Sequence, residues 1–134
     1  MIEAAAERVV SVISAVENYP EWTEGMRDVV VHSRDASGKP LEASFDIAGG
    51  PITDHVTLRY QWLEDNVSWH LVEGKSIKTL DGRYSWRSTG EKTEVTYELA
   101  VDLSMGLPTF LRRTAEKTII GNALQGLKKR VESL

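Results

Sequence analysis

The sequence predicts a single α+β domain in which one curved antiparallel sheet wraps around a long C-terminal helix. Two observations support this prediction. Runs with a hydrophobic period of two fill residues 26–103, and a run with a helical period follows over 108–131. One face of the sheet and one stripe of the helix must be buried, and each can cover the other. A chain of 134 residues is long enough for one core, so we expect one domain over 1–134.

The N-terminal segment predicts two short helices before the first strand. Residues 3–16 place their valine and isoleucine side chains on one helical face. Pro20 disfavours helix at the residue before it and can itself begin a second short helix, which Gly25 would end. Trp22 follows this break closely. We expect its large indole to lie at one mouth of the sheet–helix interior, either as a packing anchor or as a ligand contact.

Six alternating runs predict the strands of the sheet. They span residues 26–34, 41–48, 52–62, 67–74, 77–88 and 93–103, and short turns join them into a meander. The alternation predicts an apolar and aromatic inner face that contains Phe45, Ile47, Val56, Leu58, Tyr60, Trp62, Val67, Trp69, Leu71, Leu80, Gly82, Tyr84, Trp86, Val95, Tyr97, Leu99 and Val101. It places His55, His70 and the arginines of the strands on the opposite, solvated face. We expect no Asp, Glu, His, Lys or Arg side chain on the inner face.

The last helix has the strongest helical signal in the chain. Pro108 suits the first turn of a helix, because its missing N–H would have no partner there. The predicted apolar stripe consists of Leu107, Phe110, Leu111, Ala115, Ile119, Ala123, Leu127 and Val131. The basic residues 128–130 lie in the last turn, where they complement the helix dipole.

This order of elements resembles the helix-grip fold of START-like proteins, and more narrowly the bacterial polyketide cyclase/dehydrase-like, coenzyme Q-binding type branch of the SRPBCC superfamily. The segments that carry the resemblance are "ERVVSVISAVENYPEW", "DASGKPLEASFDI", "LPTFLRR" and "NALQGLKKRVE". They are packing and turn patterns rather than catalytic signatures. Such proteins begin with a strand, but only residues 1–3 precede the first helix here. We therefore expect this strand to be short or missing, or to lie upstream, which would leave an open sheet edge and favour a homodimer.

The resemblance implies that the protein binds or transports a small hydrophobic or aromatic molecule such as a lipid, a quinone or a polyketide. The ligand would lie between the sheet and the C-terminal helix. The expected contact residues are Trp22, Phe45, Tyr60, Trp69, Tyr84, Trp86, Tyr97, Leu99, Met105, Phe110 and Leu111. A pocket of this kind is mostly apolar, with a few polar groups that orient the ligand. The alternative is that these aromatic side chains form a packed core without a ligand site.

Two other function classes stay open. The first is a polyketide cyclase/dehydratase-type enzyme, but the cyclases of the family carry polar and charged side chains inside the pocket. Arg59 and Arg83, the candidates by position, alternate outward. The second is a protein-interaction module, which would have a filled core and an exposed apolar patch.

Composition excludes several kinds of chemistry. The chain contains no cysteine, so it has no disulfide and no thiolate nucleophile or metal ligand. Asp46, Asp54 and His55 lack the spacing of metal ligands and are interpreted as a solvated rim, so we expect no metal and no cofactor. The formal net charge of −4 disfavours nucleic acid as a partner. No apolar run is long enough for stable membrane insertion, and no secretion signal is present, so we expect a cytoplasmic protein.

Overall fold

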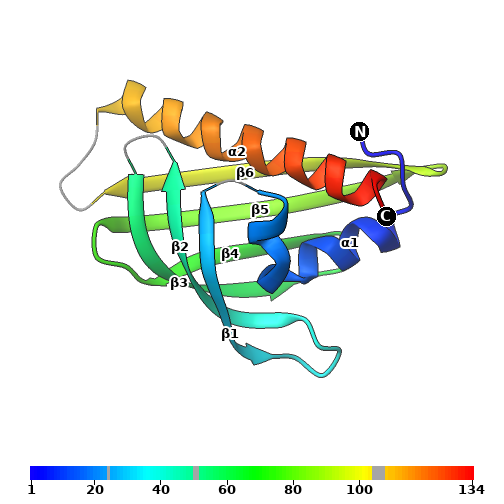
Figure 1. Cartoon of the computed structure of the whole chain (residues 1–134), viewed down its shortest axis with the longest axis horizontal. Coiled ribbons are helices and arrows are strands. Elements are labelled where there is room, and N and C mark those ends of the chain that lie inside the picture. Colours follow the sequence, from blue (N-terminus) through cyan, green and yellow to red (C-terminus); the bar gives the residue numbers. More distant parts are fainter. Residues whose placement is uncertain (24, 50–51, 104–107) are drawn as a thin grey trace.

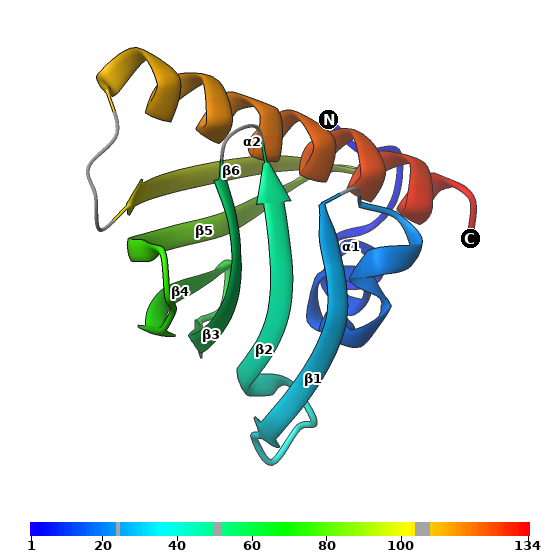
Figure 2. The same cartoon turned by 60° about the vertical axis from the view of Figure 1, so that its left-hand side comes forward.

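The computed structural model describes residues 1–23, 25–49, 52–103 and 108–134. Its elements are α1 (Ala6–Ser14), the 3-10 helix η1 (Val16–Glu21), β1 (Met26–Arg34), β2 (Pro40–Gly49), β3 (Ile52–Trp62), β4 (Asn66–Glu73), β5 (Ile77–Thr89), β6 (Lys92–Leu103) and α2 (Thr109–Glu132). The predicted curved antiparallel sheet with a long C-terminal helix is confirmed. Figures 1 and 2 show α2 lying across the concave side of the sheet, with α1 near its C-terminal half.

The six strands form one sheet in the order β1-β2-β3-β4-β5-β6, and every neighbouring pair is antiparallel. The register places large inward side chains opposite one another. Tyr60 on β3 faces Trp69 on β4, and Tyr84 on β5 faces Tyr97 on β6. Since opposite residues in an antiparallel pair share one face, this register gathers the aromatic side chains on the concave side.

The N-terminal strand that the family resemblance implies is reduced to a single antiparallel bridge, as expected. The N–H of Ile2 donates to the Thr93 carbonyl at 2.8 Å, and the N–H of Thr93 donates to the Ile2 carbonyl at 2.9 Å. Farther along β6, Oε2 of Glu116 on α2 accepts the N–H of Val101 at 2.9 Å. The edge of β6 is thus held near both ends by other parts of the chain. The expected homodimer stays a prediction.

One carboxylate corrects the prediction of an inner face without charged residues. Asp54 alternates with Val56 and Leu58 on the inner face of β3, and it is only 9% exposed, so it is not part of a solvated rim. Its partners explain why a charge is tolerated there. Oδ2 of Asp54 accepts three backbone N–H groups at 2.9–3.0 Å, those of Lys75 and Ser76 in the loop between β4 and β5 and that of Ile77 at the start of β5.

The pKa of Asp54 follows from these contacts. Burial by itself raises the pKa of this carboxyl group, but the backbone donors of Ile77, Ser76, His55 and Lys75 together lower it below its usual value. Asp54 is therefore ionised at neutral pH, and its carboxylate fastens the loop between β4 and β5 to the start of β3.

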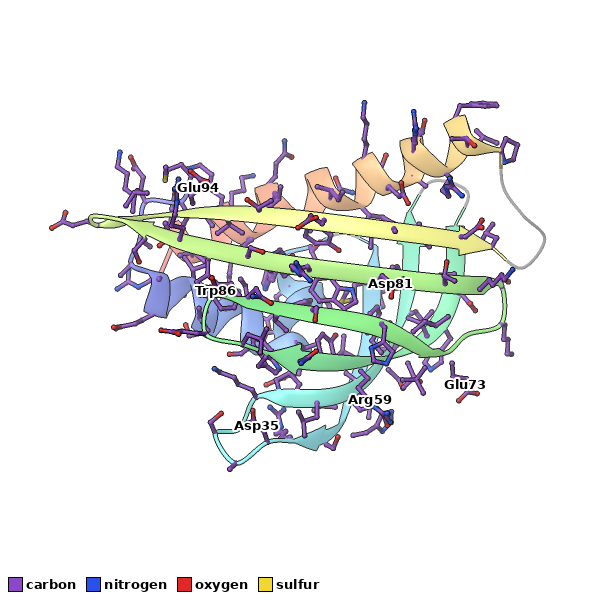
Figure 3. The ribbon with its side chains drawn as sticks, turned by 180° about the vertical axis from the view of Figure 1, so that it is seen from behind. Asp35, Arg59, Glu73, Asp81, Trp86 and Glu94 are labelled. Carbon is purple, nitrogen blue, oxygen red and sulfur yellow. The ribbon has the colours of Figure 1, made fainter. Side chains whose placement is uncertain are left out.

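The outer face of the sheet is polar. Figure 3 looks onto this face, on which Arg59 and Asp81 are labelled. Its ion pairs include Arg59 with Glu42 at 3.2 Å and His55 with Asp46 at 2.7 Å, and most of these side chains are well exposed. Ion pairs of this kind contribute little to stability. The polar side chains of this face leave it exposed to solvent, but their ion pairs add little to the stability of the sheet.

Candidate functional site

The interior between the sheet and α2 has a densely packed end. Val9, Ile13 and Val16 from the N-terminal helices are almost completely buried there, as are Leu127 and Val131 from the last turns of α2. α1 contacts α2, β5 and β6. This end is an ordinary core.

The other end of this interior contains a cavity of about 60 Å³. Its walls come from η1, the segment after it, the strands of the sheet and the middle of α2. The lining consists of Tyr19, Trp22, Thr23, Gly25, Met26, Phe45, Ile47, Ala48, Leu58, Tyr60, Trp69, Leu80, Tyr84, Tyr97, Leu99, Val101, Ile119, Asn122 and Ala123. None of these described lining residues is an Asp, Glu, Lys, Arg or His.

Four aromatic rings form a continuous wall of the cavity. The ring of Trp69 lies 6.0 Å from Tyr60, 5.5 Å from Tyr84 and 5.7 Å from Tyr97, between ring centres. Tyr84 and Tyr97 meet edge to face at 4.6 Å. Gly82 lies opposite Trp69 in the register, and a Cβ atom on Gly82 would overlap the indole ring. The glycine therefore provides the space in which Trp69 packs against β5.

The wall beside η1 is formed by Tyr19 and Trp22, whose rings meet edge to face at 4.8 Å. The hydroxyl of Tyr19 donates a hydrogen bond to the Ile13 carbonyl, which ties η1 to α1. Nε1 of Trp22 is buried and has no hydrogen-bond partner among the residues that the structure describes. Gly25 has a φ of 84°, and its carbonyl accepts the N–H of Ala48 at 2.7 Å, which joins this segment to the end of β2.

The remaining tyrosines of the wall are neutral donors. Burial, together with the neighbouring Tyr97, raises the pKa of Tyr60 and of Tyr84, and burial raises the pKa of Tyr97 itself. Within the described part of the chain, their hydroxyl oxygens have no hydrogen-bond partner, yet they are not sealed off as buried unpaired atoms. All three residues line the cavity.

The structure brings together most of the residues that the sequence singled out. Trp22, Phe45, Tyr60, Trp69, Tyr84, Tyr97 and Leu99 all line the cavity. Met105 lies outside the described residues.

Three predicted contact residues are not in the lining. Trp86 is buried, but Figure 3 places it toward the hairpin between β5 and β6, at the end of the sheet that α1 covers. Phe110 is 70% exposed and Leu111 is 36% exposed, because the first turn of α2 extends beyond the buried part of the helix. Alternation and helical spacing identify the inward side but not the position along it.

The contact residues predicted from the sequence include neither Tyr19 nor the residues of α2 that line the cavity. Ile119 and Ala123 belong to the predicted apolar stripe, so the signal for them was present. Asn122 lies beside this stripe and carried no signal. The small side chain of Ala123, opposite the aromatic wall, is one reason why space is left beneath this part of α2.

The chain belongs to the family described as "Polyketide cyclase / dehydrase and lipid transport", whose model matches residues 2–128. Its fold is START-like. A START superfamily protein from Mycobacterium smegmatis has a TM-score of 0.87 at 21% identity, over 98% of this chain and 92% of that chain. A protein from Thermus thermophilus has a TM-score of 0.79 at 21% identity, over the same shares.

The aromatase/cyclase ZhuI from a Streptomyces species has a TM-score of 0.73 at 13% identity, over 98% of this chain and 88% of that chain. At these identities the likeness to the three solved structures shows the fold alone. No curated protein is significantly similar to this chain. Among the described residues, no helix is both long and apolar enough to span a bilayer, and no group of three or more His, Asp or Glu side chains is arranged to hold a metal ion.

Proposed function

We propose that this protein binds a small hydrophobic or aromatic molecule in the cavity between the sheet and α2. The observation that carries the proposal is the lining itself, which is rich in aromatic side chains and, in its described part, free of charge. Each square ångström of apolar ligand surface removed from water contributes about 25 cal/mol to binding. Pockets for small molecules share this composition, with a few polar groups that fix the orientation.

The size of the cavity limits how a ligand enters. A space of about 60 Å³ holds a few water molecules, whereas a cavity that binds benzene measures about 150 Å³. A ligand with one or more rings therefore requires the cavity to widen. In the N-terminal half of α2, Ala115 is completely buried, but Ile119 is only half-buried and Phe110 in the first turn is exposed. We expect this half of the helix to move when a ligand binds.

The charge and pKa values of the lining favour binding over catalysis. General acid–base catalysis needs a positioned group that titrates near the working pH. The titratable groups of the described lining are Tyr19, Tyr60, Tyr84 and Tyr97, and burial raises the pKa of each. Such tyrosines are poor proton acceptors near neutral pH. The cyclase/dehydratase alternative would need a reactive group from elsewhere in the chain.

Thermal melts with and without hydrophobic probes test this proposal. We expect 1,4-naphthoquinone, dodecanol or an anthraquinone to raise the melting temperature of the wild-type protein, because a ligand that binds the native state stabilises it. Leu99→Trp should abolish the rise by filling the cavity. Ala100→Trp, one residue away on the exposed outer face, is the matched control and should retain it. If no probe raises the wild-type melting temperature and native mass spectrometry finds no co-purified ligand, the proposal is wrong.

A further inference from the structure

Several hydrogen-bonding groups of the cavity wall have no partner within the described part of the chain. The hydroxyl of Tyr19 donates a hydrogen bond to the Ile13 carbonyl. The hydroxyls of Tyr60, Tyr84 and Tyr97 have no acceptor within the described part of the chain. On the wall beside η1, Nε1 of Trp22 is buried and unpaired among the described residues, and an indole N–H can only donate. The wall therefore presents several groups that can donate a hydrogen bond and that have no partner within the described part of the chain.

A buried donor without a partner raises the free energy of the protein. Water can reach the three tyrosine hydroxyls in the empty cavity, but a hydrocarbon ligand would displace that water without replacing its hydrogen bonds. A ligand with an oxygen acceptor at the right place replaces them. The rings of Tyr84 and Tyr97 are in contact, with their centres 4.6 Å apart, so a single ligand oxygen can lie near both side chains.

The described lining also holds no positive charge. A carboxylate that entered the cavity would leave water without gaining a Lys, Arg or protonated His partner, and uncompensated burial of a charge is strongly unfavourable. Neutral donors suffice for a ketone or quinone oxygen, which carries only a partial charge. Asn122, the polar residue that α2 contributes to the lining, is uncharged as well.

We infer that the cavity selects neutral hydrophobic molecules that carry a carbonyl or quinone oxygen, and that it excludes free carboxylates of the same size. The oxygen accepts hydrogen bonds from the tyrosine cluster formed by Tyr60, Tyr84 and Tyr97. When the cavity widens around the ligand, Trp22 can contribute its indole N–H. This inference rests on the proposed function and adds the polar chemistry of the ligand to it.

Three probes with one ring system test the inference. They are 2-acetylnaphthalene, which carries a ketone, 2-ethylnaphthalene, which lacks the oxygen, and 2-naphthoate, which is ionised at neutral pH. We expect the ketone to bind wild-type protein roughly tenfold more tightly than the hydrocarbon, the factor that one net hydrogen bond supplies. The carboxylate should bind at least about a hundredfold more weakly than the ketone. Isothermal titration calorimetry gives all three affinities.

Tyrosine-to-phenylalanine variants identify the donors. Each change of Tyr60, Tyr84 or Tyr97 to Phe removes one hydroxyl, and the triple variant removes the whole cluster while keeping the rings. In the triple variant the ketone and the hydrocarbon should bind within about twofold of one another. Ser85→Ala, which removes a hydroxyl from the outer face of β5 beside Tyr84, is the control and should leave the ketone preference unchanged.

The outcomes separate the inference from the proposed function. If the ketone and the hydrocarbon bind wild-type protein equally well, or if the triple variant keeps the ketone preference, the inference is overturned while the binding function stands. Tight binding of 2-naphthoate also overturns it. If none of the probes binds, both the inference and the proposed binding function are wrong. Should the triple variant not fold, the comparison of the three probes on wild-type protein still decides the question.

Discussion

The two ends of the interior between the sheet and α2 are built from the same pattern but are filled differently. At one end, Leu127 and Val131 of α2 are completely buried against the side chains of α1 and η1. At the other end, Ile119 and Ala123 face an aromatic wall across a cavity of about 60 Å³. A continuous apolar stripe on the helix therefore does not imply a continuous core beneath it. The size of the helix side chains, and the presence of a second layer of helix, decide where the interior closes.

Two glycines of α2 have different surroundings. At the packed end, Gly126 lies so close to Trp22 that a Cβ atom on the glycine would overlap the Trp22 carbonyl oxygen. At Gly121, little more than one helical turn earlier, a Cβ atom would meet nothing within 4 Å. The two glycines lie on different faces of α2, so Gly126 marks a close contact with Trp22, whereas Gly121 has room for a side chain.

The largest expected effect is a truncation at the packed end. Leu127→Ala should lower the free energy of unfolding by about 2–5 kcal/mol, because it leaves a new hole in a region that cannot collapse. Leu99→Ala removes the same atoms at the cavity end and should cost clearly less, since Leu99 already borders open space. Urea denaturation measures both. Equal losses would mean that the two ends are packed alike.

Two glycine substitutions in α2 test the close contact at Gly126. Gly126→Ala should lower the free energy of unfolding by about 1–3 kcal/mol, because the new methyl group forces α2 away from the backbone of Trp22. Gly121→Ala has room and should instead raise it by about 0.5–1 kcal/mol through its helix propensity. Thermal melts of the two variants measure both changes in the free energy of unfolding. If Gly126→Ala is harmless, the close contact between α2 and Trp22 does not exist in solution.

Asp54 fastens the loop between β4 and β5 at the end of the sheet where the cavity lies. Asp54→Asn should lower the free energy of unfolding by about 1–3 kcal/mol at neutral pH, because its amide NH₂ would face the N–H of His55 and its remaining oxygen is a weaker acceptor. Asp81→Asn, on the exposed outer face, is the control and should have little effect.

The pH dependence of stability gives a second measure of the same carboxylate. The pKa of Asp54 is lower in the folded protein than in the unfolded chain, so its contribution is fully present above the unfolded value of about 4. It is lost as the pH falls through the lower, folded pKa. Urea denaturation from about pH 7 to about pH 2 should show this loss in the wild type and a flatter curve for Asp54→Asn. Parallel curves would contradict the assignment.

The smallest expected effect separates two tyrosine hydroxyls. Tyr19→Phe removes a hydrogen bond to the Ile13 carbonyl and should lower the free energy of unfolding by about 1 kcal/mol. Tyr84→Phe removes a hydroxyl that has no partner in the described part of the chain, and its effect should be close to zero. Denaturation curves measured side by side test this. A larger loss for Tyr84→Phe would show that its hydroxyl already has a structural partner.

The regular elements could be predicted from the sequence because their periods are strong. The final helix was expected over 108–131 and spans Thr109–Glu132, and the six strand runs correspond to the six strands. The single bridge at Ile2 also agrees with the expectation that the first strand is short or missing within this sequence. Period and turn chemistry are local properties, so a single sequence is sufficient to reveal them.

The candidate site could be predicted only in part. Alternation identified the inward aromatic residues, but it could not tell that Trp86 lies in the packed end or that Phe110 is exposed, because both depend on where the helices cross the strands. The sequence places Asp54 in a solvated rim with Asp46 and His55, because these residues lack the spacing of metal ligands. The carboxylate of Asp54 meets the backbone donors only when the loop from a distant strand folds back onto it.

Diffraction from crystals pressurised with xenon tests the central claim, that the interior is closed at one end and open at the other. Xenon enters apolar cavities that have room for it, whereas close-packed cores exclude it. We predict a xenon site bounded by Trp69, Tyr97 and Ala123, and none between Leu127 and Val9. A xenon site beside Leu127, or the absence of any at the aromatic wall, would contradict the account.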